Sequence, residues 1–411
     1  MKRESSSKIY IGEDMKKIVL IFFFLTLISI GIYLHIHLNK NKISFHEVNL
    51  TIEETEHNKA IVSTPKELIE ALESSNIEII EIIADLDLGY NLIKEEIDSP
   101  YIEEHTVPLT HPILKKTGVS NLKIQNKNHL IIYSKDGRKI LHTNIRILDS
   151  QNIKIENIKM EELWEWDEET KAEYDRNDWD YITIQNSENI QIKNCEFSKS
   201  YDGITDIKNS KNITIQYCKV NEIDIENDVF FNQQFEELEK NKEKYPMYNY
   251  LRMIGLSTDT IKKLSSHQFK LYLIGPQDND PPNENIVIHD SMYLNVKTRI
   301  PLARNSSVYL YNIYFDASKI TPNMVTTDQL KILKKDYPKI LALYGYGPIS
   351  IQGSYVVVKN CIFEGVTHKY TFARGLSLHN LGKIEVHEDK EKLIHLEENL
   401  ERIVGNRVMK E

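Results

Sequence analysis

The sequence predicts an all-β fold, a right-handed parallel β-helix with three strands per coil. The main observation is a short segment that recurs along the chain, in which isoleucine or valine alternates with polar residues and asparagine stands at the ends. Alternation with a period of two residues is typical of β-strands. The copies are NLKIQN from Asn121, NIKIEN from Asn152, NIQIKN from Asn189, NITIQY from Asn212 and NIVIHD from Asn285, with looser copies SVYLYN from Ser307 and YVVVKN from Tyr355.

The spacing of these segments separates a solenoid from other β folds. Asn189 and Asn212 are 23 residues apart, and Asn285 and Ser307 are 22 residues apart. A β-sandwich would show strands at a shorter spacing of about 8–12 residues, and the leucine signature of leucine-rich repeats is absent. A period of this length without heptads indicates stacked coils. We expect isoleucine and valine to stack inward and asparagine to occupy the tight turns.

An apolar segment precedes the repeats. From Ile18 to Leu34 the sequence IVLIFFFLTLISIGIYL has no charged residue, and the segment extends to Leu38, which is close to the ~20 residues that span a bilayer. Lysine and arginine are frequent before it, so residues 1–17 should be cytoplasmic and the rest of the chain outside. We expect residues 18–38 to be a transmembrane anchor. A cleaved signal peptide is the alternative, and it would make the protein secreted.

The remaining organisation follows from composition and helix signals. Residues 39–60 are polar and are expected to be a linker. TPKELIEALESSN, from Thr64 to Asn76, has a threonine cap, proline at the first helical position and glutamate three residues after the threonine, which predicts a helix. The β-helix should span residues 61–385. We expect a helical insertion of two helices at about 227–267 and a C-terminal tail over 386–411.

Overall composition excludes some functions. The chain has 411 residues, with 51 Lys and Arg against 61 Asp and Glu, a net charge of −10. A general nucleic-acid binder would need a basic excess. Cys195, Cys218 and Cys361 lack zinc-site spacing, and they follow equivalent strands. Buried, stacked thiols are therefore expected, although a disulfide between neighbouring rungs is conceivable. We expect a monomer.

Four aspartates mark the candidate site. Asp178 and Asp180 precede the strand YITIQN, and Asp202 and Asp206 precede the strand NITIQY, one coil later. Because equivalent residues of successive coils stack, these carboxylates should meet on one outer face. Unrelieved, they would repel one another and raise one another's pKa, and a Ca²⁺ ion would remove that cost. These residues alone leave a solvated acidic face equally possible.

Cationic residues flank strands of the following rungs. Lys270 lies in FKLYLIG, and Arg299 and Arg304 lie in VKTRIPLARN. A structural ladder of ion pairs is one interpretation, but surface ion pairs contribute little stability. Cations beside a divalent metal suit a polyanionic, carboxylated substrate, and we favour that interpretation.

Several motifs, in one order, resemble a known family. WEWDEETKAEYDRNDWDYITI, YDGITD, KLYLIG and NVKTRIPLARNSSVYLYN are similar to the pectate lyases of polysaccharide lyase family 1, over about residues 60–370. The resemblance implies a calcium-dependent pectate lyase that cleaves 4-linked polygalacturonate by β-elimination. It also implies roles for individual residues. These are Ca²⁺ binding by Asp180, Asp202 and Asp206 with Asp178 as a companion, proton abstraction by Arg299, and binding of substrate carboxylates by Lys270, Arg304 and Lys208.

Other functions stay open at this point. The alternatives are a pectin lyase or another uronan lyase, and a non-catalytic, membrane-tethered carbohydrate-binding β-helix. A pectin lyase, acting on methylated substrate, would not need the calcium carboxylates, and a carbohydrate binder would not need Arg299. The presence of both sets favours the pectate lyase. The insertion at 227–267 leaves the subsites open, and the sequence does not reveal methylation preference or endo or exo action. Trp164, Trp166 and Trp179 are left outside the site, because core packing accounts for them equally well.

Overall fold

The computed structural model describes the β-helix and most of its loops. The chain divides into two units, Met1–Ser44 and Phe45–Glu411, and the fold belongs to the second. The predicted anchor, residues 18–38, lies outside the described residues. In the part of the chain that the structure describes, no helix is both long and apolar enough to cross a membrane. The described residues are 44–51, 55, 58–106, 108–169, 176–221, 223–266, 268–275, 281–318, 325–336, 348–366, 368–372 and 382–405.

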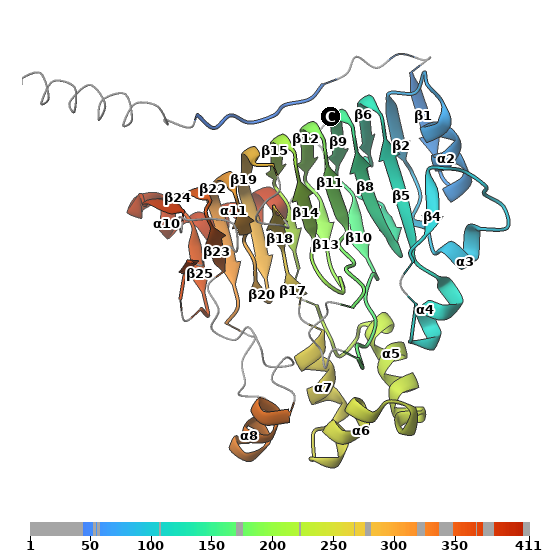
Figure 1. The fold of residues 1–411 in the computed structure, drawn as a ribbon, viewed down its shortest axis with the longest axis vertical. Coiled ribbons are helices and arrows are strands. Elements are labelled where there is room, and N and C mark those ends of the chain that lie inside the picture. Colours follow the sequence, from blue (N-terminus) through green and yellow to red (C-terminus); the bar gives the residue numbers. More distant parts are fainter. Residues whose placement is uncertain are drawn as a thin grey trace, which may run out of the picture. The chain divides into compact units, whose positions relative to one another are not determined.

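The strands form a parallel β-helix, as the sequence predicts. One coil contains β11 (Ile182–Gln185), β12 (Glu188–Lys193) and β13 (Glu196–Phe197). The next contains β14 (Thr205–Lys208), β15 (Lys211–Gln216) and β16 (Lys219–Val220). Each strand pairs in parallel with its equivalent. Over the described residues this stacking builds a 16-stranded and a 9-stranded sheet, and Figure 1 shows the strands following one another along the chain.

The other coils extend this arrangement on both sides, except that β4 pairs antiparallel with β5 and that β17 and β20 form a separate two-stranded sheet. Before β11 the strands are β1 (Lys59–Val62), β2 (Ile79–Ile82), β3 (Leu86–Asp87), β4 (Ile102–Glu104), β5 (Ser120–Gln125), β6 (Asn128–Tyr133), β7 (Lys139–Leu141), β8 (Thr143–Leu148), β9 (Gln151–Glu156) and β10 (Lys159–Glu161). After β16 they are β17 (Gln268–Lys270), β18 (Tyr272–Ile274), β19 (Asn283–Leu294), β20 (Val296–Thr298), β21 (Leu302–Arg304), β22 (Ser306–Asp316), β23 (Ile349–Gln352), β24 (Tyr355–Lys359), β25 (Ile362–Glu364), β26 (Tyr370–Phe372) and β27 (Lys383–His387).

Alternation of side chains gives the β-helix its core. Register pairs Ile153 with Ile190, Ile190 with Ile213, and Ile213 with Ile286, and all four are fully buried. Each buried isoleucine contributes about 2 kcal/mol through removal of its apolar surface from water. The polar residues between them point away from this core, and two of them, Gln191 and Thr214, are buried where they hydrogen-bond to Val48.

Asparagine ladders lie directly after the turns, near the start of β12, β15 and β19, whereas the sequence predicts asparagine within the turns. Asn189, Asn212 and Asn285 have positive φ angles of 57°, 55° and 54°, a region that asparagine tolerates better than most residues. Asn212 Nδ2 donates to Asn189 Oδ1 at 3.1 Å, and Asn285 Nδ2 donates to Asn212 Oδ1 at 3.0 Å. The side chain therefore serves both the backbone conformation at its position and the contact between rungs.

The cysteines follow the same stacking rule. Cys195 and Cys218 directly precede β13 and β16, which are neighbouring strands, and Cys361 directly precedes β25. All three are buried, and within the described part of the chain none of them is in a disulfide. This agrees with the expectation of buried thiols.

The N-terminal elements cap the first coil. Helix α2 (Pro65–Glu73) has the predicted capping box between Thr64 and Glu67, and α3 (Tyr90–Ile93) and α4 (Pro112–Thr117) follow it.

Within the predicted linker, the segment around Val48 lies against the β-helix. The backbone N–H of Val48 donates to Thr214 Oγ1 at 2.8 Å, and Gln191 Nε2 donates to the Val48 carbonyl at 2.8 Å.

The insertion after β16 contains three α-helices and a short 3₁₀-helix, where the sequence suggested two helices. They are α5 (Val229–Lys240), the 3₁₀-helix η1 (Lys242–Lys244), α6 (Pro246–Met253) and α7 (Thr258–Ser265). Tyr245, which precedes Pro246, has a non-helical backbone with φ −121° and ψ 80°. Residues before proline avoid the helical region, and this divides the segment. Phe231 and Phe235 of α5 pack on Trp164 and Trp166.

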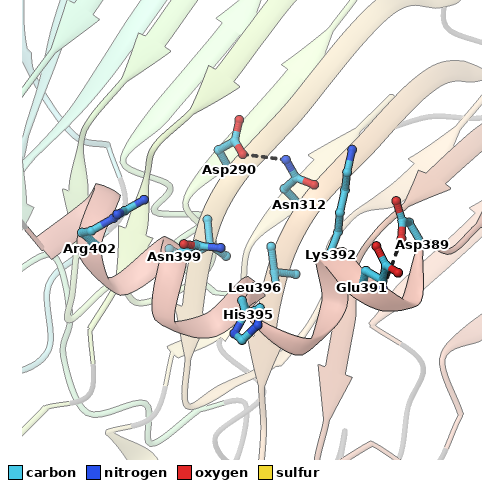
Figure 2. A pocket seen from close by; sticks show the side chains of 10 residues that line it. Asp290, Asn312, Asp389, Glu391, Lys392, His395, Leu396, Asn399 and Arg402 are labelled. Carbon is cyan, nitrogen blue, oxygen red and sulfur yellow. Dashed lines mark hydrogen bonds between the residues drawn. The ribbon is translucent and has the colours of Figure 1, made fainter.

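The C-terminal elements complete the fold. Helix α8 (Thr327–Asp336) lies between β22 and β23 in the chain, and α10 (Lys390–Ile394) and α11 (Leu396–Gly405) follow β27. Leu396 and Leu400 are buried in a small cluster with Met292 and Tyr314. Figure 2 shows the cavity of about 500 Å³ beside α11, where Asn312 Nδ2 donates to Asp290 Oδ1 at 2.8 Å.

Candidate active site

The four predicted aspartates meet at the start of two neighbouring strands. Asp178 and Asp180 precede β11, Asp202 lies in the loop before β14, and Asp206 lies within β14. Carboxylate oxygens of Asp178, Asp180 and Asp202 lie within 4.8 Å of one another. Register places Asp206 beside Thr183 of β11. The stacking expected from the repeat therefore brings carboxylates of two rungs together on the outer face.

A glycine makes room for this cluster. The Cα of Gly203 lies against the Asp180 carboxylate, so that a Cβ at this position would overlap Asp180 Oδ1. Ser200 Oγ donates to the Gly203 carbonyl at 2.6 Å and shapes the same loop. Beneath the loop, the buried rings of Trp179 and Tyr201 lie 5.3 Å apart. The glycine of YDGITD is thus needed for close approach of the two rungs.

A buried carboxylate fixes the loop that carries Asp178 and Asp180. Glu165 is fully buried and is ion-paired with Arg176. Asn177 Nδ2 donates to Glu165 Oε1 at 3.0 Å, and the backbone N–H of His111 donates to Glu165 Oε2 at 3.0 Å. Since residues 176 and 177 directly precede Asp178, these contacts determine where the metal-binding candidates lie.

Burial and nearby charges change the pKa values of the aspartates. Burial raises the pKa of Asp180 well above its ordinary value, and the charges of Asp206, Asp202 and Asp178 raise it further. The pKa of Asp206 is raised to about 8, first by burial and then by Asp202 and Asp178. Burial also raises the pKa of Asp202, although Lys270 and Arg299 oppose the rise. The cluster is costly to ionise unless a cation joins it.

Two of the predicted cations lie next to the carboxylates. Lys270 is buried and forms an ion pair with Asp202, and it pairs with Thr298 between β17 and β20. Arg299 directly follows β20, is half-buried and has a φ of 64°. Its carbonyl accepts a hydrogen bond from the Tyr272 N–H at 2.8 Å. Residues in this uncommon region often occur at functional sites.

The other two predicted cations, Lys208 and Arg304, are the last residues of their strands. Lys208 ends β14 and lines the cavity that also contains Asp178, Asp180 and Asp206. Arg304 ends β21, outside the group that lines this cavity, and its Nε donates to Gln352 Oε1 at 2.8 Å. The structure thus places Lys208 beside the carboxylates and Arg304 further along the outer face.

The cavity beside the carboxylates contains residues that the sequence analysis missed. Its volume is about 430 Å³, and on the side toward β5 and β8 it is lined by His105, Asn121, Asn144 and Arg146. Asn144 Nδ2 donates to Thr183 Oγ1 at 3.2 Å. Burial lowers the pKa of His105 to about 4. The strand register was the available signal, since Arg146 pairs with Thr183.

The donor set fits a hard divalent cation. Carboxylate oxygens of Asp178, Asp180 and Asp202 converge, and two of these residues, Asp178 and Asp180, line the cavity. Carboxylate and amide oxygens in loose geometry are the ligands that Ca²⁺ takes. The buried Asn177 also lines this cavity, and its Oδ1 has no hydrogen-bond partner in the described part of the chain. Glu165 only accepts hydrogen bonds, so it fixes the amide with Nδ2 toward itself.

A parallel β-helix with this mixed acidic and basic cleft on one sheet defines a class of protein, the β-helical polysaccharide lyases. No family model matches the chain. Pectate lyase B of Paenibacillus amylolyticus is 37% identical over 305 residues, which is 71% of this chain and 76% of that protein. The chain therefore belongs to the pectate lyases of polysaccharide lyase family 1, and it is a polysaccharide lyase.

Solved structures agree with this assignment. A pectate lyase from Paenibacillus sp. 0602 superposes with a TM-score of 0.74 at 32% sequence identity and covers 83% of this chain and 80% of its own. A pectate lyase from Bacillus sp. N165 in complex with trigalacturonate has a TM-score of 0.51 at 15% identity, covering 88% of this chain and 97% of its own. The second likeness shows the fold alone.

Proposed function

We propose that this chain is a calcium-dependent pectate lyase that cleaves 4-linked polygalacturonate by β-elimination, with Arg299 as the base. The observation that carries the proposal is the convergence of Asp178, Asp180 and Asp202 within 4.8 Å, with Lys270 in an ion pair with Asp202. Membership of the pectate lyase family supports the same substrate. A solvated acidic face would not bring these carboxylates together, and it would not raise the pKa values of Asp180, Asp202 and Asp206 through burial.

Different residues would bind the metal ion and remove the proton. Asp178, Asp180, Asp202 and Asp206 would hold Ca²⁺, which when bound supplies positive charge for the carboxylate of the reacting sugar. Arg299 would remove the proton from C5, which is acidic because it is α to the C6 carboxylate. The electrons of that C–H bond form the C4–C5 double bond as the C4–O bond breaks, and the leaving oxygen takes a proton from solvent. No water attacks the sugar, unlike in glycoside hydrolysis.

The other cations would bind and orient the polymer. Lys270, on the Arg299 side of the cluster, would contact the carboxylate whose negative charge grows as the C5 proton leaves. Arg304 offers a planar guanidinium suited to a carboxylate, and Gln352 fixes its Nε. Lys208 would contact a sugar carboxylate from within the cavity. Arg299 can accept a proton only when it is deprotonated, so we expect activity to rise with pH.

The assay that tests this proposal follows the unsaturated product by ultraviolet absorbance. Purified protein is mixed with polygalacturonate, with and without Ca²⁺, and in parallel with highly methylated pectin. We expect product from polygalacturonate only with Ca²⁺, and Asp206→Ala should be slower and partly rescued by high Ca²⁺. Full activity in excess chelator would contradict the calcium site. Binding of the polymer without product would favour a non-catalytic carbohydrate-binding protein.

For localisation, we propose that the β-helix lies outside the cell membrane and is anchored by residues 18–38. The lack of charge from Ile18 to Leu34 and the lysines and arginine before it support this. N-terminal sequencing of the mature protein is the test. A mature chain that begins near residue 32 to 45 would show a cleaved signal peptide and a secreted enzyme.

A further inference from the structure

Arg146 lies on the same outer face as the aspartate cluster but on its N-terminal side. It occupies the middle of β8, between the buried Ile145 and Ile147, so its side chain points outward. Register pairs Arg146 with Thr183 and Thr183 with Asp206. Arg146 is therefore two rungs from Asp206, about 10 Å at the spacing of neighbouring strands. Lys270 and Arg299 lie beyond Asp206 in the opposite direction.

The guanidinium of Arg146 is only loosely held by the protein. Its NH1 atom lies 3.6 Å from Glu103 Oε1, while the other carboxylate oxygen of Glu103 lies 2.5 Å from Lys123 Nζ. The Arg146 side chain is 32% exposed, and it lines the cavity that contains Asp178 and Asp206. A weak ion pair at a partly exposed site contributes little stability, and it can be exchanged for a ligand carboxylate.

The groups around Arg146 suit the hydroxyl groups of a sugar. Asn121 and Asn144 line the same side of the cavity, and Gln185 lines it one rung further on, at the end of β11. All three offer amide donors and acceptors. Burial lowers the pKa of His105 to about 4, so this ring is neutral at ordinary pH and adds no second cation. Arg146 is the cation on this side of the cavity, whereas Lys208 lines the side of β14. A cation with neutral amides near it matches a uronate, which has one carboxylate and several hydroxyls.

We propose that Arg146 binds the carboxylate of a second galacturonate residue, in a subsite on the N-terminal side of the metal-binding aspartates. This inference rests on the proposed function and deepens it. A galacturonate chain has a carboxylate on every residue, and a chain laid across the rungs passes both the aspartate cluster and Arg146. Cations would then hold the polymer on both sides of the reacting sugar.

The test measures binding of galacturonate oligomers by titration calorimetry in the presence of Ca²⁺. An Arg299→Lys background slows turnover during the measurement. Arg146→Gln should weaken binding of a hexamer about tenfold, as expected for the loss of one charged hydrogen-bonded contact. The effect on a trimer should be smaller, because a trimer can bind without reaching Arg146. Arg146→Lys, which keeps the charge but loses the fork, should lie in between.

Lys123→Gln is the matched control, because it removes the other cation that contacts Glu103 and lies outside the group lining the cavity. We expect it to leave hexamer binding unchanged. Equal losses in Arg146→Gln and Lys123→Gln would show a structural role for the ion pairs and overturn the subsite. Unchanged hexamer affinity in a folded Arg146→Gln would also overturn it. If the parent protein bound no oligomer at all, the proposed function itself would fall.

Discussion

Gly203 lies directly against the carboxylate of Asp180, so a methyl group at position 203 would overlap Oδ1 and lie 3.3 Å from Cγ. The two residues belong to neighbouring rungs, and the loop of one rung leaves space for the acid of the other. Because Asp180 is buried and belongs to the converging group of carboxylates, a change at Gly203 tests the metal site without removing any ligand.

Gly203→Ala should weaken Ca²⁺ binding by about tenfold or more, because the added methyl displaces the Asp180 carboxylate and an ion held by several carboxylates depends on all of them. Calorimetric titration with Ca²⁺ measures this. Gly137→Ala is the control, since its φ of 69° makes the substitution strained while its surroundings leave space for the methyl. It should lower stability by about 1 kcal/mol without changing Ca²⁺ affinity. Equal Ca²⁺ affinity in both variants would contradict the role of Gly203.

The raised pKa of Asp206 predicts how pH affects the metal-free protein. The pKa is about 8 in the fold against an ordinary value of 3.8. Between these values the folded chain holds a proton that the unfolded chain has lost. The resulting stability is fully present below pH 3.8 and is lost as the pH rises through about 8. Asp180 and Asp202, whose pKa values are also raised, act in the same direction.

Thermal unfolding with a chelator and with Ca²⁺ measures this effect. Asp206→Asn cannot ionise, so without Ca²⁺ its advantage in Tm over the parent protein should grow as the pH rises from about 5 to about 9. With Ca²⁺, which binds the ionised carboxylates, the parent protein should regain stability over the same range and the variant should not. A difference in Tm that is independent of pH would show that Asp206 ionises normally.

Glu165→Gln should lower the free energy of unfolding by about 3 kcal/mol, because it removes the charge of a fully buried carboxylate that is paired with the partly buried Arg176. It should also weaken Ca²⁺ binding, since Glu165 fixes Asn177 beside Asp178. Glu169 provides the control. It lies 3.9 Å from the same arginine with its side chain 63% exposed, and Glu169→Gln should change stability by no more than about 0.5 kcal/mol. Urea unfolding distinguishes the two variants, and similar losses in both would contradict the account.

The β-helix could be predicted from the sequence because its signals are local and repeated. The alternation around Ile190 and Ile213 predicts the strands, and the asparagines at 189 and 212 predict the turns. Since register follows from the repeat, it also indicated that the acids of two rungs would meet. The same reasoning placed the candidate metal ligands on one outer face and Lys270 beside a strand of the following rungs.

Features that depend on non-repeating contacts could not be predicted in this way. Arg146 lies between two ordinary isoleucines in β8, and only its register with Thr183 connects it with the site. The position of Asn177 depends on the hydrogen bond that it donates to Glu165 across a loop. The hydrogen bond from the Val48 N–H to Thr214 joins residues far apart in the sequence, and no local sequence pattern predicts it.

The proposed base is tested most directly by the steady-state kinetics of Arg299→Lys on polygalacturonate with saturating Ca²⁺, across neutral to alkaline pH. Lysine keeps a positive charge but moves the proton acceptor and loses the planar fork. If Arg299 removes the C5 proton, kcat should fall by about 100-fold or more while polymer binding stays near that of the parent protein. Arg304→Lys is the comparison and should mainly raise KM. An Arg299→Lys enzyme with a kcat close to that of the parent protein would contradict the assignment of Arg299 as the base.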